Sequence, residues 1–134
     1  MSSARTQERP RNRARAKIGS RRCAERVASF APLATPDARV LILGTMPGVA
    51  SLAAAQYYAH PRNQFWSLMG ELCGARPELP YAERCRILLA RHVALWDVFG
   101  SCVRPGSADS AIELADAQLN DLPGFIAADR KSVV

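Results

Sequence analysis

Two short, almost wholly apolar runs mark the centre of the predicted fold. Residues 40–43 (Val-Leu-Ile-Leu) stop at Gly44, and residues 93–98 (Val-Ala-Leu-Trp-Asp-Val) are followed by Phe-Gly-Ser at 99–101. Apolar runs without alternation are typical of strands that are buried on both faces, as in a parallel sheet. We therefore predict two parallel strands over these runs, and we expect residues 99–101 to leave the second strand.

The segment between the two runs carries helical signals. Ser51 is placed to cap a short helix over residues 52–56, and Asn63 is placed to cap a second helix over residues 64–73. Gly74 would end that second helix. Its apolar positions follow helical spacing on one face; they are Phe65, Leu68, Met69 and Leu72.

Further helices complete an alternating α/β pattern. One helix is predicted to begin near Pro80, a helical turn near residues 109–110, and a last helix over residues 121–128. Alternating strands and helices imply a parallel sheet with right-handed crossovers. Ligand sites of such sheets lie beyond the carboxyl ends of the strands, here residues 44–48 and 99–104. Two strands do not make a stable sheet, so we expect C-terminal strands to be missing.

The basic charge of the chain is concentrated at its start. The 134 residues carry a net charge of +6, which invites a nucleic-acid interpretation. Residues 1–30 hold nine basic and two acidic side chains, a net +7, so the remainder nets −1. Almost no large apolar side chain occurs in residues 1–25, and we predict a disordered tail over residues 1–28. A misassigned start codon, a mitochondrial presequence and a phosphate-neutralising arm are the alternatives.

Composition favours one globular domain in the cytoplasm. Apolar residues make up 49% and charged residues 22%, and no run of roughly 18 apolar residues occurs, which argues against membrane insertion. The four cysteines are spaced 50, 12 and 17 residues apart, and only two histidines are present. Such spacing does not suit a metal site. We predict reduced thiols, no metal, no cofactor, no membrane contact and a monomer.

Two neighbouring motifs carry the candidate chemistry. Residues 44–48 read Gly-Thr-Met-Pro-Gly, and nine residues later residues 58–66 read Tyr-Ala-His-Pro-Arg-Asn-Gln-Phe-Trp. A Gly-x-x-Pro-Gly loop after a buried strand brings backbone N–H groups close to a ligand, because glycine has no Cβ. The loop alone is weak evidence for any particular function. The loop followed by the second motif at this distance is strong evidence.

Together these motifs resemble the uracil-DNA glycosylase superfamily, and most closely its DNA-deoxyinosine (hypoxanthine-DNA) glycosylase branch. The resemblance covers residues 29–126. It implies a three-layer α/β/α fold with a parallel sheet over residues 29–128. In related mismatch-specific enzymes a loop asparagine positions the attacking water, but Met46 stands at that place here. The resemblance therefore moves the catalytic role to Asn63.

The implied activity is hydrolysis of an N-glycosidic bond in double-stranded DNA by a monofunctional glycosylase. A deaminated base, with hypoxanthine as the first candidate, would be flipped into a pocket. Asn63 would either orient the attacking water or form a hydrogen bond with the base, and Arg62 would contact phosphate. Uracil or xanthine specificity and an inactive nucleic-acid-binding fragment are the alternatives. The substrate-binding residues implied are Gly44, Thr45, Met46, Pro47, Gly48, Tyr58 and His60.

Each of these residues also has a purely structural interpretation. Asn63 is placed as a helix cap, Tyr58 suits core packing, and His60 before a proline suits a turn. Asp97, at the end of the second strand, is assigned no chemistry, and Asp109 is interpreted as a helix cap.

The end of the chain differs from the resembled family. Family members continue past residue 126 with two further strands and a Pro-Ser loop that enters the minor groove. The DNA string GATCGGAAGAGCGTCGTG, part of a common sequencing adapter, would translate to Asp-Arg-Lys-Ser-Val-Val, the sequence of residues 129–134. We expect adapter read-through here; a short paralogue and a frameshifted gene are the alternatives. In each case we expect the chain to fold poorly and to show little glycosylase activity.

Overall fold

The computed structural model describes residues 25–129 and 132–134. The basic tail predicted over residues 1–28 therefore lies mostly outside the described residues. Its last four residues are described, and three of them form strand β1 (Arg26–Ala28), so the predicted boundary is wrong at this point. The reason is long-range pairing, since Val27 lies antiparallel to Cys102 on a strand far along the chain.

The predicted parallel pair forms the centre of the fold. Strand β2 (Val40–Gly44) runs parallel to β3 (Val93–Asp97), and the register pairs Gly44 with Asp97 at their carboxyl ends. A short strand β6 (Ser132–Val133) pairs parallel with the other edge of β2. It comes from the segment predicted to be a non-native tail, and the origin of that segment stays a prediction.

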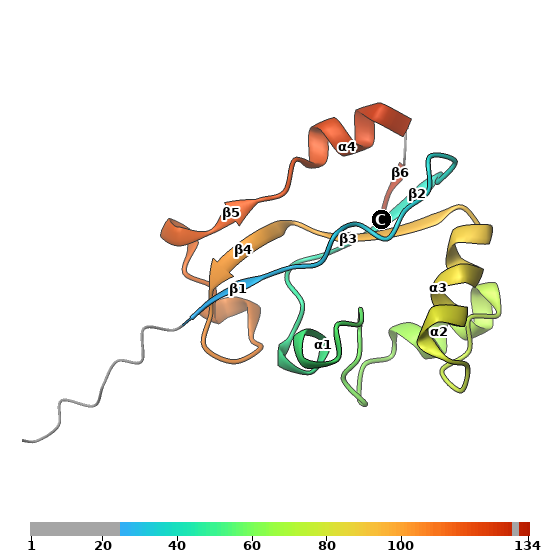
Figure 1. Cartoon of the computed structure of the whole chain (residues 1–134), viewed down its shortest axis with the longest axis horizontal. Coiled ribbons are helices and arrows are strands. Elements are labelled where there is room, and N and C mark those ends of the chain that lie inside the picture. The colour runs from blue at the N-terminus through green and yellow to red at the C-terminus, as the bar shows by residue number, and fades with distance from the viewer. Residues whose placement is uncertain (1–24, 130–131) are drawn as a thin grey trace, which may run out of the picture.

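A second sheet continues the line of β3, and the sequence did not predict it. Strand β4 (Phe99–Val103) pairs antiparallel with β1 on one side and with β5 (Gln118–Leu119) on the other. Residues 99–101 leave β3, as predicted, but they enter β4 of the other sheet. Val98 still donates its N–H to the Gly44 carbonyl oxygen at 2.8 Å, and the chain then continues extended alongside new partners (Figure 1).

The predicted helices are present to within a few residues. In the described part of the chain they are α1 (Val49–Ala54), α2 (Phe65–Cys73), α3 (Tyr81–Ala90) and α4 (Leu122–Asp129). Two 3₁₀ turns, Asp109–Ala111 and Leu114–Asp116, lie between β4 and β5. Ser51 does not cap α1: Gly48 precedes that helix, and Ser51 is buried inside it.

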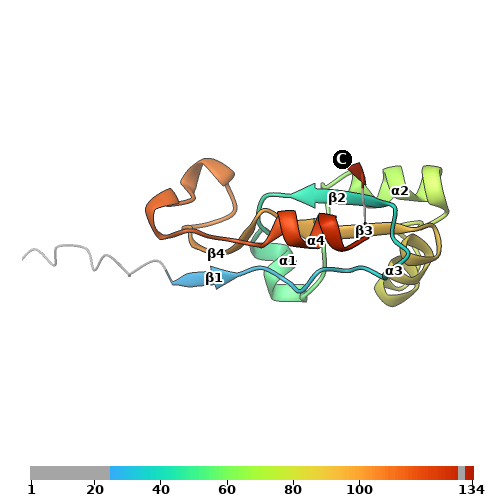
Figure 2. The same ribbon diagram turned by 90° about the horizontal axis from the view of Figure 1, so that it is seen from above.

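The helices enclose the parallel sheet in three layers, with α1, α2 and α3 on one face and α4 on the other (Figure 1). Seen from above, α4 lies over β3 (Figure 2). Successive residues of β3 alternate between the layers: Leu95 packs with the α2–α3 side, whereas Ala94 and Trp96 pack with Phe125 of α4. Burial on both faces, predicted from the apolar runs, is confirmed.

Helix α2 buries a different face from the one that its apolar spacing predicts. Trp66 and Met69 are buried, while Leu68 and Leu72 are 50% and 64% exposed. Trp66 packs in the core beside Met69, and its Nε1 donates to the Tyr57 carbonyl oxygen at 2.9 Å. The indole N–H therefore has a partner inside the fold, which makes burial of this face favourable.

Candidate active site

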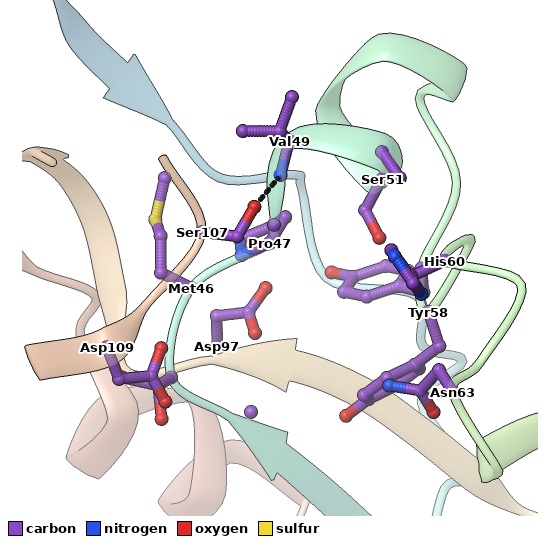
Figure 3. A pocket seen from close by; sticks show the side chains of 15 residues that line it. Met46, Pro47, Val49, Ser51, Tyr58, His60, Asn63, Asp97, Ser107 and Asp109 are labelled. Atoms are coloured by element: carbon purple, nitrogen blue, oxygen red, sulfur yellow. Dashed lines mark hydrogen bonds between the residues drawn. The ribbon is translucent and has the colours of Figure 1, made fainter. Parts of the chain in front are cut away.

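A cavity of about 300 Å³ lies at the carboxyl ends of β2 and β3 (Figure 3). Three loops form its walls: residues 44–48 with the start of α1, residues 57–63, and residues 107–109. The position is the one expected for an open parallel sheet. The lining residues are Gly44, Thr45, Met46, Pro47, Gly48, Val49, Ala50, Ser51, Tyr57, Tyr58, His60, Asn63, Asp97, Ser107 and Asp109.

Gly44 is required where β2 meets the cavity. A Cβ at this position would lie 2.4 Å from Asp97 Oδ1 and 3.3 Å from the Tyr58 hydroxyl oxygen. The missing side chain therefore lets two polar groups of the cavity approach the backbone. Two residues further on, Met46 is buried against Cys102 and Ile112, so its side chain anchors the loop in the core.

Arg104 holds the same loop from outside the cavity, and the sequence assigned it no role. Its side chain is buried, and it donates hydrogen bonds to the carbonyl oxygens of Met46, Pro47 and Gly106. Close by, Ser107 Oγ accepts the Val49 N–H at 2.8 Å. These bonds join the loop after β4 to the loop after β2, so the two loops form one wall.

Tyr58 projects from a tightly held loop. Its backbone has a φ of 55°, which is rare for an aromatic residue and marks a functional constraint when neighbouring contacts enforce it. Tyr57 supplies that enforcement by donating its N–H to the Tyr81 hydroxyl at 3.0 Å and its own hydroxyl to the Ala31 carbonyl oxygen at 2.9 Å. The Tyr58 ring stacks on Phe65 with centroids 3.9 Å apart.

The Tyr58 phenol stays protonated at neutral pH. Burial, and then the negative charge of Asp97, raise its pKa to about 12. The side chain therefore offers the cavity an aromatic ring and a neutral hydroxyl.

Asn63 lines the cavity and also accepts a hydrogen bond at the start of α2. Its Oδ1 accepts the Phe65 N–H at 2.8 Å. The prediction of Asn63 as N-cap is wrong by one residue, because α2 begins at Phe65 and Gln64 occupies the N-cap position without a side-chain cap bond. Its Nδ2 has no hydrogen-bond partner within the part of the chain that the structure describes. One atom of the amide is thus used by the fold, while the other remains a donor for a ligand.

His60 shapes the turn before Asn63. Its Nδ1 accepts the Arg62 N–H at 3.1 Å, as the turn interpretation predicts, and its exposed side chain also reaches the cavity. The Arg62 side chain is exposed and does not line the cavity. The structure therefore brings Asn63, His60, Tyr58 and the Gly44–Gly48 loop together, and leaves Arg62 apart from them.

Asp97 is the main residue that the sequence left without a role. Its side chain is only 4% exposed, it points into the cavity (Figure 3), and its Oδ2 has no partner among the described residues. Burial, reinforced by the charge of Asp109 and opposed by that of Arg104, raises its pKa to about 6. An unpartnered buried carboxylate costs stability, and such groups gather at functional sites.

The Asp97→Asn variant tests this cost. Because the pKa of Asp97 in the folded protein lies above its ordinary value of 3.8, the folded protein binds the proton of Asp97 more tightly than the unfolded chain does. Wild-type stability therefore rises as the pH falls from about 6 to about 4. Above pH 7 the wild type carries the buried charge and the variant does not. We therefore expect the variant to have a free energy of unfolding about 2 kcal/mol higher than that of the wild type.

Urea unfolding at pH 7.5 and at pH 4.5 measures this difference. The advantage of Asp97→Asn should be large at pH 7.5 and should fall to about a third of that value at pH 4.5, where the folded wild type carries a neutral acid but the unfolded chain is still mostly ionised. An equal difference at both pH values would show that ionisation of Asp97 is not its cause.

The described residues hold no cluster of three or more His, Cys, Asp or Glu side chains arranged for a metal ion. Cys73, Cys85 and Cys102 are free thiols, and Cys23 lies outside the described residues. Among the described helices, none has the length and apolar character needed to cross a membrane.

Fold and site together define an α/β protein with a glycine-lined ligand cavity at the carboxyl ends of its central parallel strands. Residues 31–132 match the model of the Uracil DNA glycosylase superfamily, and the chain belongs to this superfamily. The family and the α/β fold predicted from the sequence are thus confirmed.

Two relatives are named hypoxanthine DNA glycosylase. The protein of Methanosarcina barkeri is 37% identical over 92 residues, 68% of this chain and 57% of the relative. That of Methanosarcina acetivorans is 35% identical over 97 residues, 72% of this chain and 60% of the relative. The chain thus spans about three fifths of the length of these relatives.

A solved structure is also similar. It is the solution NMR structure of a Methanosarcina acetivorans protein assigned as a uracil DNA glycosylase. The two structures share a TM-score of 0.67 and 31% sequence identity, over 79% of this chain and 65% of the other. The likeness therefore extends over most of the described fold.

Proposed function

We propose that this site hydrolyses the N-glycosidic bond of a deaminated base in double-stranded DNA, with hypoxanthine as the preferred base. The observation that carries the proposal is the convergence of the Gly44–Gly48 loop, Tyr58, Asn63 and Asp97 on one cavity. Its volume of about 300 Å³ is at the lower end of ligand pockets, which suits a single base flipped out of the duplex. The names of the two Methanosarcina relatives support the choice of hypoxanthine.

Recognition of the flipped base would use one ring and one acceptor. Tyr58 lines the cavity and is backed by Phe65, so a base that stacked on the opposite face of its ring would extend an existing aromatic pair. The unpartnered Asp97 Oδ2, ionised above pH 6, accepts hydrogen bonds and donates none. Hypoxanthine offers a ring N–H where adenine has only a lone pair, so this acceptor favours the deaminated base.

Bond cleavage would proceed without a covalent intermediate. The C1′–N9 bond breaks, and its electron pair leaves with the purine. Water adds to C1′ and loses a proton to solvent, while the purine anion takes up a proton from solvent. The products are the free base and an abasic sugar. The sugar gains oxocarbenium character in the transition state, as in glycoside cleavage generally. The free Nδ2 of Asn63 would donate to the purine as negative charge develops there.

An excision assay on defined duplexes tests the function. The chain, in excess over substrate, is incubated with duplexes that contain one deoxyinosine, deoxyuridine, deoxyxanthosine or unmodified deoxyadenosine, and abasic sites are revealed by alkali. We expect weak excision, because little activity is predicted for this chain, with deoxyinosine cleaved fastest and deoxyadenosine untouched. Faster cleavage of deoxyuridine or deoxyxanthosine would show that uracil or xanthine is the preferred base. Binding without cleavage would show that the chain is an inactive nucleic-acid-binding fragment. The monomeric state and cytoplasmic location stay predictions.

A further inference from the structure

A second cavity, of about 250 Å³, adjoins the first and shares Tyr58, His60 and Asn63 with it. Its remaining lining includes Gln56, Ser67 and Arg84, and no Asp or Glu is among its lining residues. The polar groups at its wall therefore include several N–H and O–H donors and no carboxylate. A cavity of this kind attracts an anion.

Arg84 gives this cavity a fixed positive charge. The guanidinium carbon lies 4.7 Å from the centroid of the buried Trp66 ring and 5.5 Å from that of Tyr81. Nε donates to the Leu79 carbonyl oxygen at 3.0 Å, which further orients the group. No salt bridge joins Arg84 to a carboxylate within the described residues. By contrast Arg86, two residues along the same helix, pairs with Glu83.

We propose that the second cavity binds a phosphate of the DNA backbone beside the flipped nucleotide, and that Arg84 is its main ligand. The proposal rests on the proposed function. Only the sugar and one carbon atom separate a base from its own 5′ phosphate, and the two cavities meet at Asn63 and His60. A base in the first cavity therefore places a phosphate within reach of the second.

The chemistry of arginine suits this role. A guanidinium presents a planar fork of donors that fits two phosphate oxygens, and stacking on Trp66 already holds the fork in place. Little side-chain freedom is then lost on binding. Arg62, to which the sequence assigned phosphate contact, lines neither cavity.

The salt dependence of duplex binding tests the role of Arg84. Fluorescence anisotropy with a deoxyinosine duplex is measured between 50 and 200 mM NaCl for the wild type and for Arg84→Gln, Arg84→Lys and Arg86→Gln. Each phosphate contact contributes about 0.9 to the slope of log K against log salt. We expect Arg84→Gln to lose about one unit of slope and about tenfold in affinity at low salt. Arg84→Lys should keep the slope, and Arg86→Gln should behave as wild type.

Two results would overturn the inference while leaving the proposed function intact. One is an Arg84→Gln variant that binds more weakly with an unchanged slope, since Arg84 then only supports Trp66. The other is an equal loss of slope in Arg86→Gln, which would indicate general charge attraction. A wild-type chain that excises no base and binds no duplex would instead refute the proposed function together with the inference.

A second measurement needs no variant and so does not depend on folding of Arg84→Gln. A single phosphate of the duplex is replaced by an uncharged methylphosphonate, either next to the deoxyinosine or several nucleotides away. We expect about tenfold weaker wild-type binding for the adjacent replacement and little change for the distant one. Equal affinities for both duplexes would overturn the inference.

Discussion

The Asn63→Ala variant is expected to excise hypoxanthine at least about 100-fold more slowly than the wild-type chain under single-turnover conditions. Removal of one preorganised donor that stabilises developing charge costs on the order of 100-fold to 1,000-fold in rate. In the proposed function, the free Nδ2 of Asn63 at the cavity wall would be such a donor. Alkali-revealed strand scission at protein excess measures the loss.

The hydrogen bond that Asn63 accepts from Phe65 requires a control for stability. Alanine removes the acceptor of the Phe65 N–H and should cost about 1 kcal/mol of unfolding free energy. Aspartate at position 63 keeps an acceptor for that N–H, yet it lacks the donor. We therefore expect Asn63→Asp to unfold like the wild type and to be as slow as Asn63→Ala. Normal excision by Asn63→Asp would leave Asn63 with a structural role alone.

The Gly44→Ala variant is expected to lose excision to a similar extent. The new Cβ would lie 2.4 Å from Asp97 Oδ1, and the buried Asp97 side chain has little room to retreat. It must shift into the cavity, where it competes with the base for space. Overpacking of this kind also costs about 1–3 kcal/mol of stability. The readouts are the single-turnover excision rate and the urea unfolding curve.

Gly70→Ala is the matched control for this crowding. A Cβ at Gly70 would lie 3.1 Å from the Arg76 Cα, so it also crowds a packed position, but Gly70 does not line the candidate site. The loss of a glycine inside α2 offsets part of this crowding. We expect a small change in stability and a nearly normal excision rate on the folded protein. If both glycine variants lost the same fraction of rate, general destabilisation would explain the effect of Gly44→Ala.

Much of the fold was predictable because its signals are local. The apolar run that ends at Gly44 needs burial on both faces, and the structure supplies helices on both sides. Gly74 ends α2 with a φ of 82°, as a C-terminal glycine does. The same reasoning missed β4, because its pairing with β1 joins residues about 75 positions apart and leaves no mark on the local pattern.

The candidate site divides in the same way. Its two motifs, residues 44–48 and 58–66, are contiguous and could be recognised from residue types and spacing. Arg104 carries no such signal, since an isolated arginine near a strand end is usually exposed. Its importance lies in burial and in its bonds to Met46 and Pro47, which the chain brings close from 57 or more residues away.

The sequence by itself determined the α/β class, the two central strands and the glycine-rich and Asn63-containing motifs, because each depends on neighbouring residues. Only the tertiary structure decided that Asp97 is a buried acid with a pKa of about 6 whose Oδ2 lacks a hydrogen-bond partner among the described residues. It also decided that Arg84 lies beside the site without an ion pair to any described carboxylate. Both properties arise from desolvation and from contacts between distant segments. The physical reason is that burial and charge pairing depend on the packed chain as a whole.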